Sequence, residues 1–164
     1  MEKTKRIGFY PGSFDPVTLG HLDIIRRASA CFDKLYVCVM VNCEKQHPMF
    51  TAEERVELIR ASVAGMDNVE VESCSGLLAD YAVGKGACVL VKGVRNATDF
   101  DQEYQMASIN RGIHPQLETV FLPSSAPYQH FSSTMVREMI RYGQPMEKYV
   151  PAPVAEELKR KERS

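Results

Sequence analysis

Two short stretches of the sequence place hydroxyl groups and an ionisable side chain next to the start of a helical pattern. The first, TLGH at 18–21, ends on His21, and Ser13 lies a few residues upstream. We expect Thr18 to cap the helix, whose first turn has backbone N–H groups without intrahelical partners. These groups carry partial positive charge, so they suit a phosphate and favour the neutral form of the His21 imidazole. The stretch therefore predicts recognition of an anion, although a plain helix cap with a solvated histidine is the simpler alternative.

A second stretch, 123–137, repeats this pattern farther along the chain. It brings Ser132, Ser133 and Thr134 to the start of another helical pattern, with Arg137 about one turn in. Three hydroxyls, free amides and a guanidinium make a second candidate anion site. Taken alone, this stretch is also consistent with an ordinary helix cap. Two such junctions at one edge of a sheet indicate a shared anionic ligand.

Basic side chains lie on the loops that are predicted to surround these two junctions. They are Lys45, Lys92, Arg95 and Arg137. Gly93, between two of them, permits close approach of a ligand to the backbone. Each cation alone is most simply a solvated surface charge. Four cations from separate loops at one edge suit a polyphosphate substrate.

Other common chemistries lack their sequence motifs. There is no P-loop and no nucleophile elbow, and the glycines at 84–86 precede a strand instead of following one. The four histidines lack metal-ligand spacing, so no protein metal site is expected. The five cysteines form no C-x-x-C pair, and Cys38 and Cys88 lie in apolar runs where we expect buried, reduced thiols. A redox protein built on these cysteines is a remote alternative.

The composition of the chain is that of an ordinary globular protein. Its 164 residues are 45% hydrophobic and 25% charged, which allows one domain over 1–164 with a core of its own. A net charge of −1 gives no global attraction to nucleic acid or to an anionic membrane. No apolar run reaches the roughly 18 residues of a membrane span, and no signal peptide is recognisable. We therefore expect a cytoplasmic protein.

The apolar patterns that must position these residues alternate between two periods. Segments typical of strands are 5–10, 34–42, 68–74, 87–93 and 118–124. Segments typical of helices are 19–32, 51–65, 77–86, 99–112, 133–143 and 152–163. The unbroken apolar run 35–41 is typical of a strand buried on both faces, and Thr51 and Glu54 have the spacing of a capping box. The alternation predicts an α/β fold with a single doubly wound five-stranded parallel sheet, which binds ligands beyond the carboxyl ends of its strands.

The two junctions also resemble the signatures of a known superfamily. TLGH at 18–21 resembles the (H/T)-x-G-H signature of the nucleotidyltransferases, and FSSTMVR at 131–137 resembles their I-S-S-T-x-x-R signature. The stretches YPGSFDPVTLGH, PMFTAEERV, VLVKGVR and DFDQE extend the likeness to the bacterial phosphopantetheine adenylyltransferases over nearly the whole chain. The resemblance implies a Rossmann-like nucleotidyltransferase fold.

The resemblance also implies a reaction. ATP and 4′-phosphopantetheine would give dephospho-coenzyme A and pyrophosphate, the penultimate step of coenzyme A biosynthesis, by direct in-line attack without a covalent intermediate. Mg²⁺ would be carried by the ATP phosphates. The family is typically a homohexamer, and feedback by coenzyme A is left open.

Site residues are implied by position in the family motifs. His21 would stabilise the transition state at the α-phosphate of ATP. The ATP-binding residues would be Ser13, Phe14, His21, Gly93, Val94, Arg95, Glu103, Tyr128, Gln129, His130, Phe131, Ser132, Ser133 and Thr134. The phosphopantetheine-binding residues would be Ser13, Lys45, Leu78 and Lys92.

Two positions depart from the family pattern. Members commonly have two lysines just before the Pro-Met-Phe segment, whereas this chain reads EKQHP at 44–48, with one extra residue. Counting from the second predicted strand selects Lys45, and counting back from Pro48 selects Gln46. We choose Lys45, because a neutral amide does not replace a cation on a phosphate. Lys92 stands where many members have arginine, which keeps the charge but loses the bidentate geometry.

Two other functions stay open at this stage. A sister enzyme with the same signatures could use another acceptor, such as nicotinamide mononucleotide or a sugar or glycerol phosphate. The stretches KGVR at 92–95 and DFDQE at 99–103 argue against it. A non-catalytic nucleotide-binding domain, in which His21 is incidental, is the other alternative.

Overall fold

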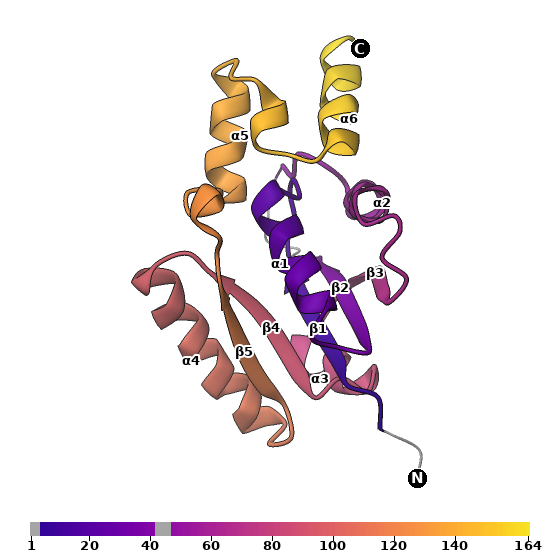
Figure 1. Ribbon diagram of the computed structural model, residues 1–164, viewed down its shortest axis with the longest axis vertical. Helices are drawn as coiled ribbons and strands as arrows, with labels where there is room; N and C mark the ends of the chain where they lie inside the picture. The colour runs from indigo at the N-terminus through magenta and orange to yellow at the C-terminus, as the bar shows by residue number, and fades with distance from the viewer. Residues whose placement is uncertain (1–3, 42–46) are drawn as a thin grey trace.

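Five parallel strands form one sheet in a computed structural model that describes residues 4–41 and 47–164 (Figure 1). They are β1 (Ile7–Gly12), β2 (Lys34–Met40), β3 (Val69–Cys74), β4 (Val89–Val94) and β5 (Glu118–Pro123). The strand order is β3-β2-β1-β4-β5, and every neighbouring pair is parallel. The predicted α/β fold with a doubly wound five-stranded sheet is confirmed.

Helices follow the strands as the sequence predicts. They are α1 (Leu19–Ser29), α2 (Ala52–Ser62), α3 (Leu78–Gly84), α4 (Ala97–Ile113), α5 (Ser133–Arg141) and α6 (Ala152–Glu162). Two one-turn 3₁₀ helices, η1 (Ala126–Tyr128) and η2 (Met146–Lys148), were not predicted. In Figure 1, α5 and α6 lie beyond one end of the sheet, on the side where the site is built. Within the described residues, no helix has both the length and the apolar character needed to cross a bilayer.

The core lies on both faces of β2. Leu35 and Val37 are fully buried in a large cluster with Ile25 of α1, while Tyr36 and Cys38 belong to a second cluster. Because successive side chains of a strand point to opposite faces, these two clusters cover the two sides of the sheet. The interpretation of this run as a strand buried on both faces is confirmed.

The cysteines differ from the sequence-based expectation. Cys88, just before β4, is exposed instead of buried. Cys38 and Cys74 are paired as a disulfide between β2 and β3, with Cα atoms 6.3 Å apart. The expectation of reduced cysteines is therefore wrong for this pair. Their separation of 36 residues carries no local signal, because only the parallel pairing of β2 with β3 brings them together.

The strand order determines where a ligand can enter the sheet. The chain builds β1, β2 and β3 outward in one direction, then crosses over so that β4 pairs on the other side of β1. The connections diverge between β1 and β4, which leaves a crevice at their carboxyl ends. Both predicted anion-binding junctions lie at this edge.

Candidate active site

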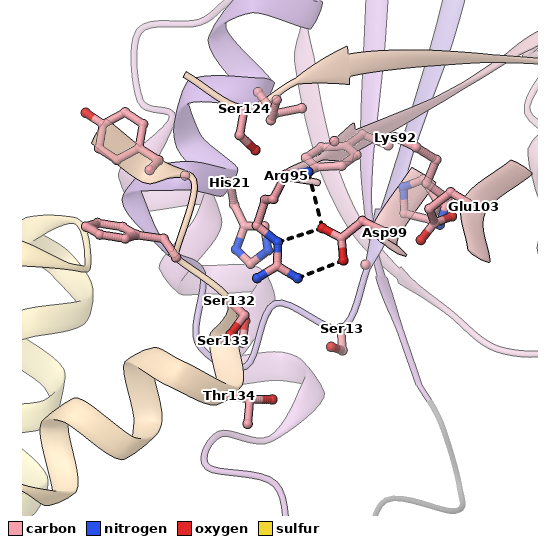
Figure 2. Close-up of a pocket in the computed structure, with 18 of the residues that line it drawn as sticks. Ser13, His21, Lys92, Arg95, Asp99, Glu103, Ser124, Ser132, Ser133 and Thr134 are labelled. Atoms are coloured by element: carbon pink, nitrogen blue, oxygen red, sulfur yellow. Dashed lines mark hydrogen bonds and ion pairs between the residues drawn. The ribbon is translucent and has the colours of Figure 1, made fainter. Parts of the chain in front are cut away.

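A cleft of about 360 Å³ opens at the carboxyl ends of β1 and β4 (Figure 2). Residues from the ends of β1 and β4 and their following loops, from the first turn of α1 and from α4 line one part of it, among them the predicted Ser13, His21, Lys92, Gly93, Arg95 and Glu103. The segment between β5 and α5, together with the first turn of α5, forms a wall on another side, and it contributes the predicted Tyr128, Phe131, Ser132, Ser133 and Thr134. The two junctions and three of the predicted cations, Lys92, Arg95 and Arg137, therefore meet in one cavity.

His21 is held by a reciprocal pair of hydrogen bonds with the residue that caps α1. Its backbone N–H donates to Thr18 Oγ1 at 3.2 Å, and the Thr18 N–H donates to His21 Nδ1 at 3.0 Å. A backbone N–H can only donate, so Nδ1 is the acceptor and the neutral ring carries its proton on Nε2. The predicted cap at Thr18 is confirmed. This histidine can offer a ligand an uncharged hydrogen-bond donor.

The surroundings of His21 keep the ring neutral. Burial in the cleft, followed by the charge of Arg95, lowers the pKa of His21 from 6.5 to about 4. The expected neutral form is confirmed, although its causes are burial and the charge of Arg95, not the helix end. Phe14 packs against the ring edge-on, with centroids 5.0 Å apart. Phe14 is itself buried, with a φ of 48°, and does not line the cleft.

The first turn of α1 keeps an amide available for a ligand. Leu19 N–H donates to the carbonyl of Tyr149 at 2.9 Å, and the His21 amide is taken by its cap. Among hydrogen bonds of the described residues, none starts from the Gly20 amide. Gly20 lines the cleft, where a Cβ would lie 3.4 Å from Tyr128 Cβ and 3.5 Å from Phe131 Cβ. Glycine thus leaves the amide accessible beside the closely packed wall.

Buried charges fix the loop that leads from β1 into α1. The carboxylate of Asp15 accepts from the amides of Met49 and Phe50, each at 2.9 Å. Arg137 donates to the Asp15 carbonyl at 2.6 Å, and the buried Arg55 donates to the Ser13 carbonyl at 2.7 Å. The loop is therefore attached to α5, to α2 and to the segment before α2. Neither Asp15 nor Arg55 was predicted from the sequence as a residue that shapes the site.

The cations of β4 and its following loop are paired with carboxylates of α4. Lys92 Nζ lies 3.2 Å from Glu103 Oε2, and Arg95 contacts both carboxylate oxygens of Asp99, at 2.8 and 3.1 Å (Figure 2). Burial, with a contribution from Glu103, raises the pKa of the Tyr10 hydroxyl in the same cleft. The acids hold the cations in place and balance their charge before any ligand binds.

Several cleft residues were not predicted from the sequence. They include Tyr10, Ile24, Asp99, Gln102 and Ser124. One signal was available for Asp99, since it precedes Glu103 by four residues and so shares its helix face. Tyr10 reads in the sequence as part of an apolar strand. The predicted strand 5–10 ends on Tyr10, whereas β1 runs on to Gly12, so Tyr10 lies within the strand near its carboxyl end.

The start of α5 combines structural hydroxyls with free amides. Ser132 caps the helix by accepting from the Met135 amide at 3.0 Å, and Ser133 Oγ donates to the Pro16 carbonyl at 3.0 Å. Thr134 Oγ1 accepts from Arg137 at 3.3 Å. The amides of Ser133 and Thr134, at the first two positions of the helix, therefore remain for an anion.

Some predicted residues lie outside this cleft lining. Val94 is half-buried and does not line it, and Gln129 and His130 are exposed. Leu78 begins α3 and packs against the second hydrophobic cluster. Lys45 and its alternative Gln46 lie outside the described residues. Contacts of these residues with a ligand stay predictions.

The cleft has the chemistry of a polyphosphate site. Two helix starts, a neutral imidazole and three guanidinium or ammonium groups surround one cavity. Such groups bind phosphate and stabilise negative charge that develops at phosphorus. Among residues 4–41 and 47–164, no three His, Cys, Asp or Glu side chains are grouped so that they could hold a metal ion.

Comparison with known proteins connects this cleft with one enzyme family. A family model described as cytidylyltransferase-like matches residues 9–139. The phosphopantetheine adenylyltransferase of Alkaliphilus metalliredigens is 46% identical over 156 residues, covering 95% of this chain and 99% of that relative. The phosphopantetheine adenylyltransferase of Synechococcus sp. (strain JA-3-3Ab) is 48% identical over 153 residues, covering 93% and 96%.

Solved structures of lower identity share the fold. A bifunctional NMN adenylyltransferase/ADP ribose pyrophosphatase from Francisella tularensis superposes with a TM-score of 0.67 at 19% identity, and the match covers 90% of this chain but 45% of that one. A putative nicotinate-nucleotide adenylyltransferase from Vibrio parahaemolyticus gives a TM-score of 0.65 at 20% identity, covering 93% and 91%. The predicted Rossmann-like nucleotidyltransferase fold is confirmed.

Proposed function

Because this chain belongs to the phosphopantetheine adenylyltransferase family of nucleotidyltransferases, we propose that it transfers the adenylyl group of ATP to 4′-phosphopantetheine. The products would be dephospho-coenzyme A and pyrophosphate. The names of the relatives support the choice of acceptor. The observation that carries the reaction class is the neutral His21 at the start of α1, held by Thr18 inside a cleft with three cations.

The reaction we propose is a direct displacement at phosphorus. A phosphate oxygen of the acceptor forms a bond to the α-phosphorus of ATP, and the bond from that phosphorus to the bridging oxygen of pyrophosphate breaks. The acceptor phosphate is already an anion near neutral pH, so the step needs no general base. Catalysis then consists of alignment and of stabilising charge on the five-coordinate phosphorus.

The residues of the cleft divide this work between them. His21 Nε2–H and the Gly20 amide would donate to the α-phosphate as its negative charge grows. The amides of Ser133 and Thr134, with Arg95, would hold the remaining phosphates. On the acceptor side, Ser13 and Lys92 would hold the phosphate together with Lys45, and Leu78 would contact the pantetheine arm.

Mg²⁺ belongs to the proposal as a companion of ATP. Asp99 and Glu103, the acids of α4 that line the cleft, are engaged by Arg95 and Lys92. We therefore propose that the ion is held by the triphosphate oxygens, where it offsets part of their charge.

Assembly as a cytoplasmic homohexamer is also part of the proposal. Apolar side chains of α4 and the edge strand β5 are left exposed, namely Phe100, Tyr104, Met106, Ile109, Ile113 and Val120. Clusters of exposed apolar side chains commonly mark sites of association. We expect copies of the chain to meet there, and light scattering of the protein and of an Ile109→Lys variant measures whether they do.

An acceptor screen tests the proposed reaction. The protein is incubated with ATP and, in turn, with 4′-phosphopantetheine, nicotinamide mononucleotide or glycerol phosphate, while pyrophosphate release is followed. We expect release with phosphopantetheine alone. Release with nicotinamide mononucleotide but not with phosphopantetheine would replace the proposal with the sister activity. No turnover with any acceptor, despite ATP binding, would favour a non-catalytic nucleotide-binding domain.

A further inference from the structure

An ionic contact on α1 reaches from the helix that carries His21 to the base of the cleft wall. Asp23 lies two residues after His21, and its Oδ2 accepts from Ser125 Oγ at 2.7 Å and from Arg27 Nη1 at 3.1 Å. The same Arg27 nitrogen donates to the carbonyl of Pro123 at 2.8 Å. The Asp23 side chain is 22% exposed, so this junction is largely sheltered from solvent.

The segment held by Asp23 is where the wall begins. Ser124 lies between the two contacted residues, lines the cleft and donates its amide to the Val94 carbonyl at 2.8 Å (Figure 2). Immediately after it come η1 and the aromatic residues Tyr128 and Phe131, whose rings pack together with centroids 5.4 Å apart. A shift of this segment would therefore move the surface that covers Gly20.

The far end of the wall is anchored to the same part of the molecule. Ser133 Oγ donates to the carbonyl of Pro16, and Arg137 donates to the carbonyl of Asp15. Both acceptors lie in the loop that precedes α1. The wall is thus attached at both ends to the unit that holds His21, and Asp23 provides the attachment at the β5 end.

We propose that Asp23 is a positioning residue for the nucleotide, which fixes the β5 end of the wall against α1 through Ser125 and Arg27. This inference rests on the proposed function, because it assigns the wall to ATP. Asp23 does not line the cleft and acts through the residues that it holds. A charge-assisted hydrogen bond fixes a segment more firmly than a neutral one, and small displacements of a positioning group are costly for binding and catalysis.

Three variants test the inference by separating the two substrates. Asp23→Ala should raise the KM and the Kd for ATP about tenfold, which corresponds to the loss of one or two hydrogen bonds. The KM for phosphopantetheine should stay within about twofold, since Asp23 does not contact that side of the cleft. Asp23→Asn should recover part of the ATP affinity, because its amide oxygen still accepts from Ser125 but no longer carries the charge. Ser125→Ala should give a smaller rise than Asp23→Ala.

A matched control removes an ion pair of similar length elsewhere. Glu57→Ala breaks the exposed pair of Glu57 with Arg60 on α2, at 2.6 Å, and should leave both KM values unchanged. The inference is overturned if Asp23→Ala lowers only the melting temperature, or if it raises both KM values equally. Ser125→Ala, which keeps the contact of Asp23 with Arg27, decides the matter if Asp23→Ala does not fold. Calorimetry measures the Kd for ATP without turnover, so it tests the role of Asp23 even if the acceptor screen shows no reaction. A failure of this inference is therefore distinguishable from a failure of the proposed function.

Discussion

Helices α1 and α2 begin with the same local device but use it differently. In each, a threonine caps the helix, and the third helical residue bonds back to the amide of that threonine: Thr18 with His21 in α1, and Thr51 with Glu54 in α2. The first turn of α2 contains two acidic residues, whereas the first turn of α1 contains none. The difference lies in which charge compensates the positive end of the helix.

The comparison shows how a common structural motif becomes a binding site. In α2, the carboxylate of Glu54 both completes the capping box and offsets the positive helix end, so this end needs no external anion. In α1, the neutral imidazole of His21 completes the box without adding negative charge. The partial positive charge and the amide of Gly20 therefore stay available at the cleft for an external anion.

The largest expected effect comes from replacing His21, the third residue of α1, by glutamate, the residue type at the third position of α2. His21→Glu keeps a capping-box residue, so the helix should form, but it removes the Nε2–H donor and places a carboxylate beside the phosphates. We expect turnover to fall by more than about 10³-fold and ATP binding to weaken, as measured by kcat and by the Kd for ATP. His21→Gln, a neutral capping-box residue, should nearly preserve ATP affinity and still reduce turnover about 10²-fold. Turnover of the Glu variant within tenfold of the parent would contradict this assignment.

Local motifs such as these are what the sequence could reveal. The capping box of α2 lies within four residues, so the types and spacing of Thr51 and Glu54 predict it directly, and Thr18 is predicted as the cap of α1 in the same way. That the His21 side chain completes a box with Thr18 was not predicted, because histidine is not the usual residue at that position. The parallel sheet follows from the alternation of apolar periods, and the sheet in turn predicts which loops meet. The edge that carries the site, with the convergence of Lys92, Arg95 and Arg137, could therefore be predicted from the amino-acid sequence alone.

Contacts between distant residues could not be predicted in the same way. Asp15 is separated by 34 and 35 residues from the amides it accepts from, Arg55 by 42 from the Ser13 carbonyl, and Asp23 by 102 from Ser125. The residue type does not distinguish a buried Asp or Arg from a solvated one, because burial depends on tertiary packing that the local sequence pattern does not contain. The partners of these charges follow from the tertiary fold alone.

The next effect concerns the pH dependence of stability. The pKa of His21 is lowered to about 4 in the folded protein, whereas an unfolded histidine titrates near 6.5. Between these values the unfolded chain binds a proton that folded His21 does not, so the free energy of unfolding decreases as pH falls from 6.5 toward 4. The contribution is on the order of 2 kcal/mol. Urea unfolding should show that the free energy of unfolding decreases less between pH 7 and pH 4.5 for His21→Gln than for the parent. Equal decreases would refute the lowered pKa.

A smaller effect is expected where the capping box is purely structural. Thr51→Ala removes the acceptor for the Glu54 amide, at 3.1 Å, and should cost about 1 kcal/mol of unfolding free energy. Its kcat/KM should stay within about twofold. Thr18→Ala removes the equivalent acceptor from α1, and it should reduce turnover as well because it loosens His21. Equal activity losses in the two alanine variants would mean that the boxes do not differ in function.

The smallest effect separates the charge of Glu54 from its hydrogen bond. The Thr51 amide, followed by Lys161, lowers the pKa of Glu54 below its ordinary 4.5. The charged form therefore stabilises the folded protein above that value, and this contribution is lost as pH falls through the lowered pKa. Because Glu54→Gln keeps a capping-box side chain, it should cost only a few tenths of a kcal/mol at pH 7 and nothing at pH 2.5. Denaturant unfolding at the two pH values measures the difference in free energy of unfolding between the parent and the variant. A difference that grew on acidification would show that the carboxylate is not what stabilises α2. The contribution of Glu54 to the free energy of unfolding changes below pH 4.5, and that of His21 changes mostly above pH 4.5. One series of unfolding experiments over pH therefore distinguishes the capping residue that stabilises α2 from the one that lines the cleft.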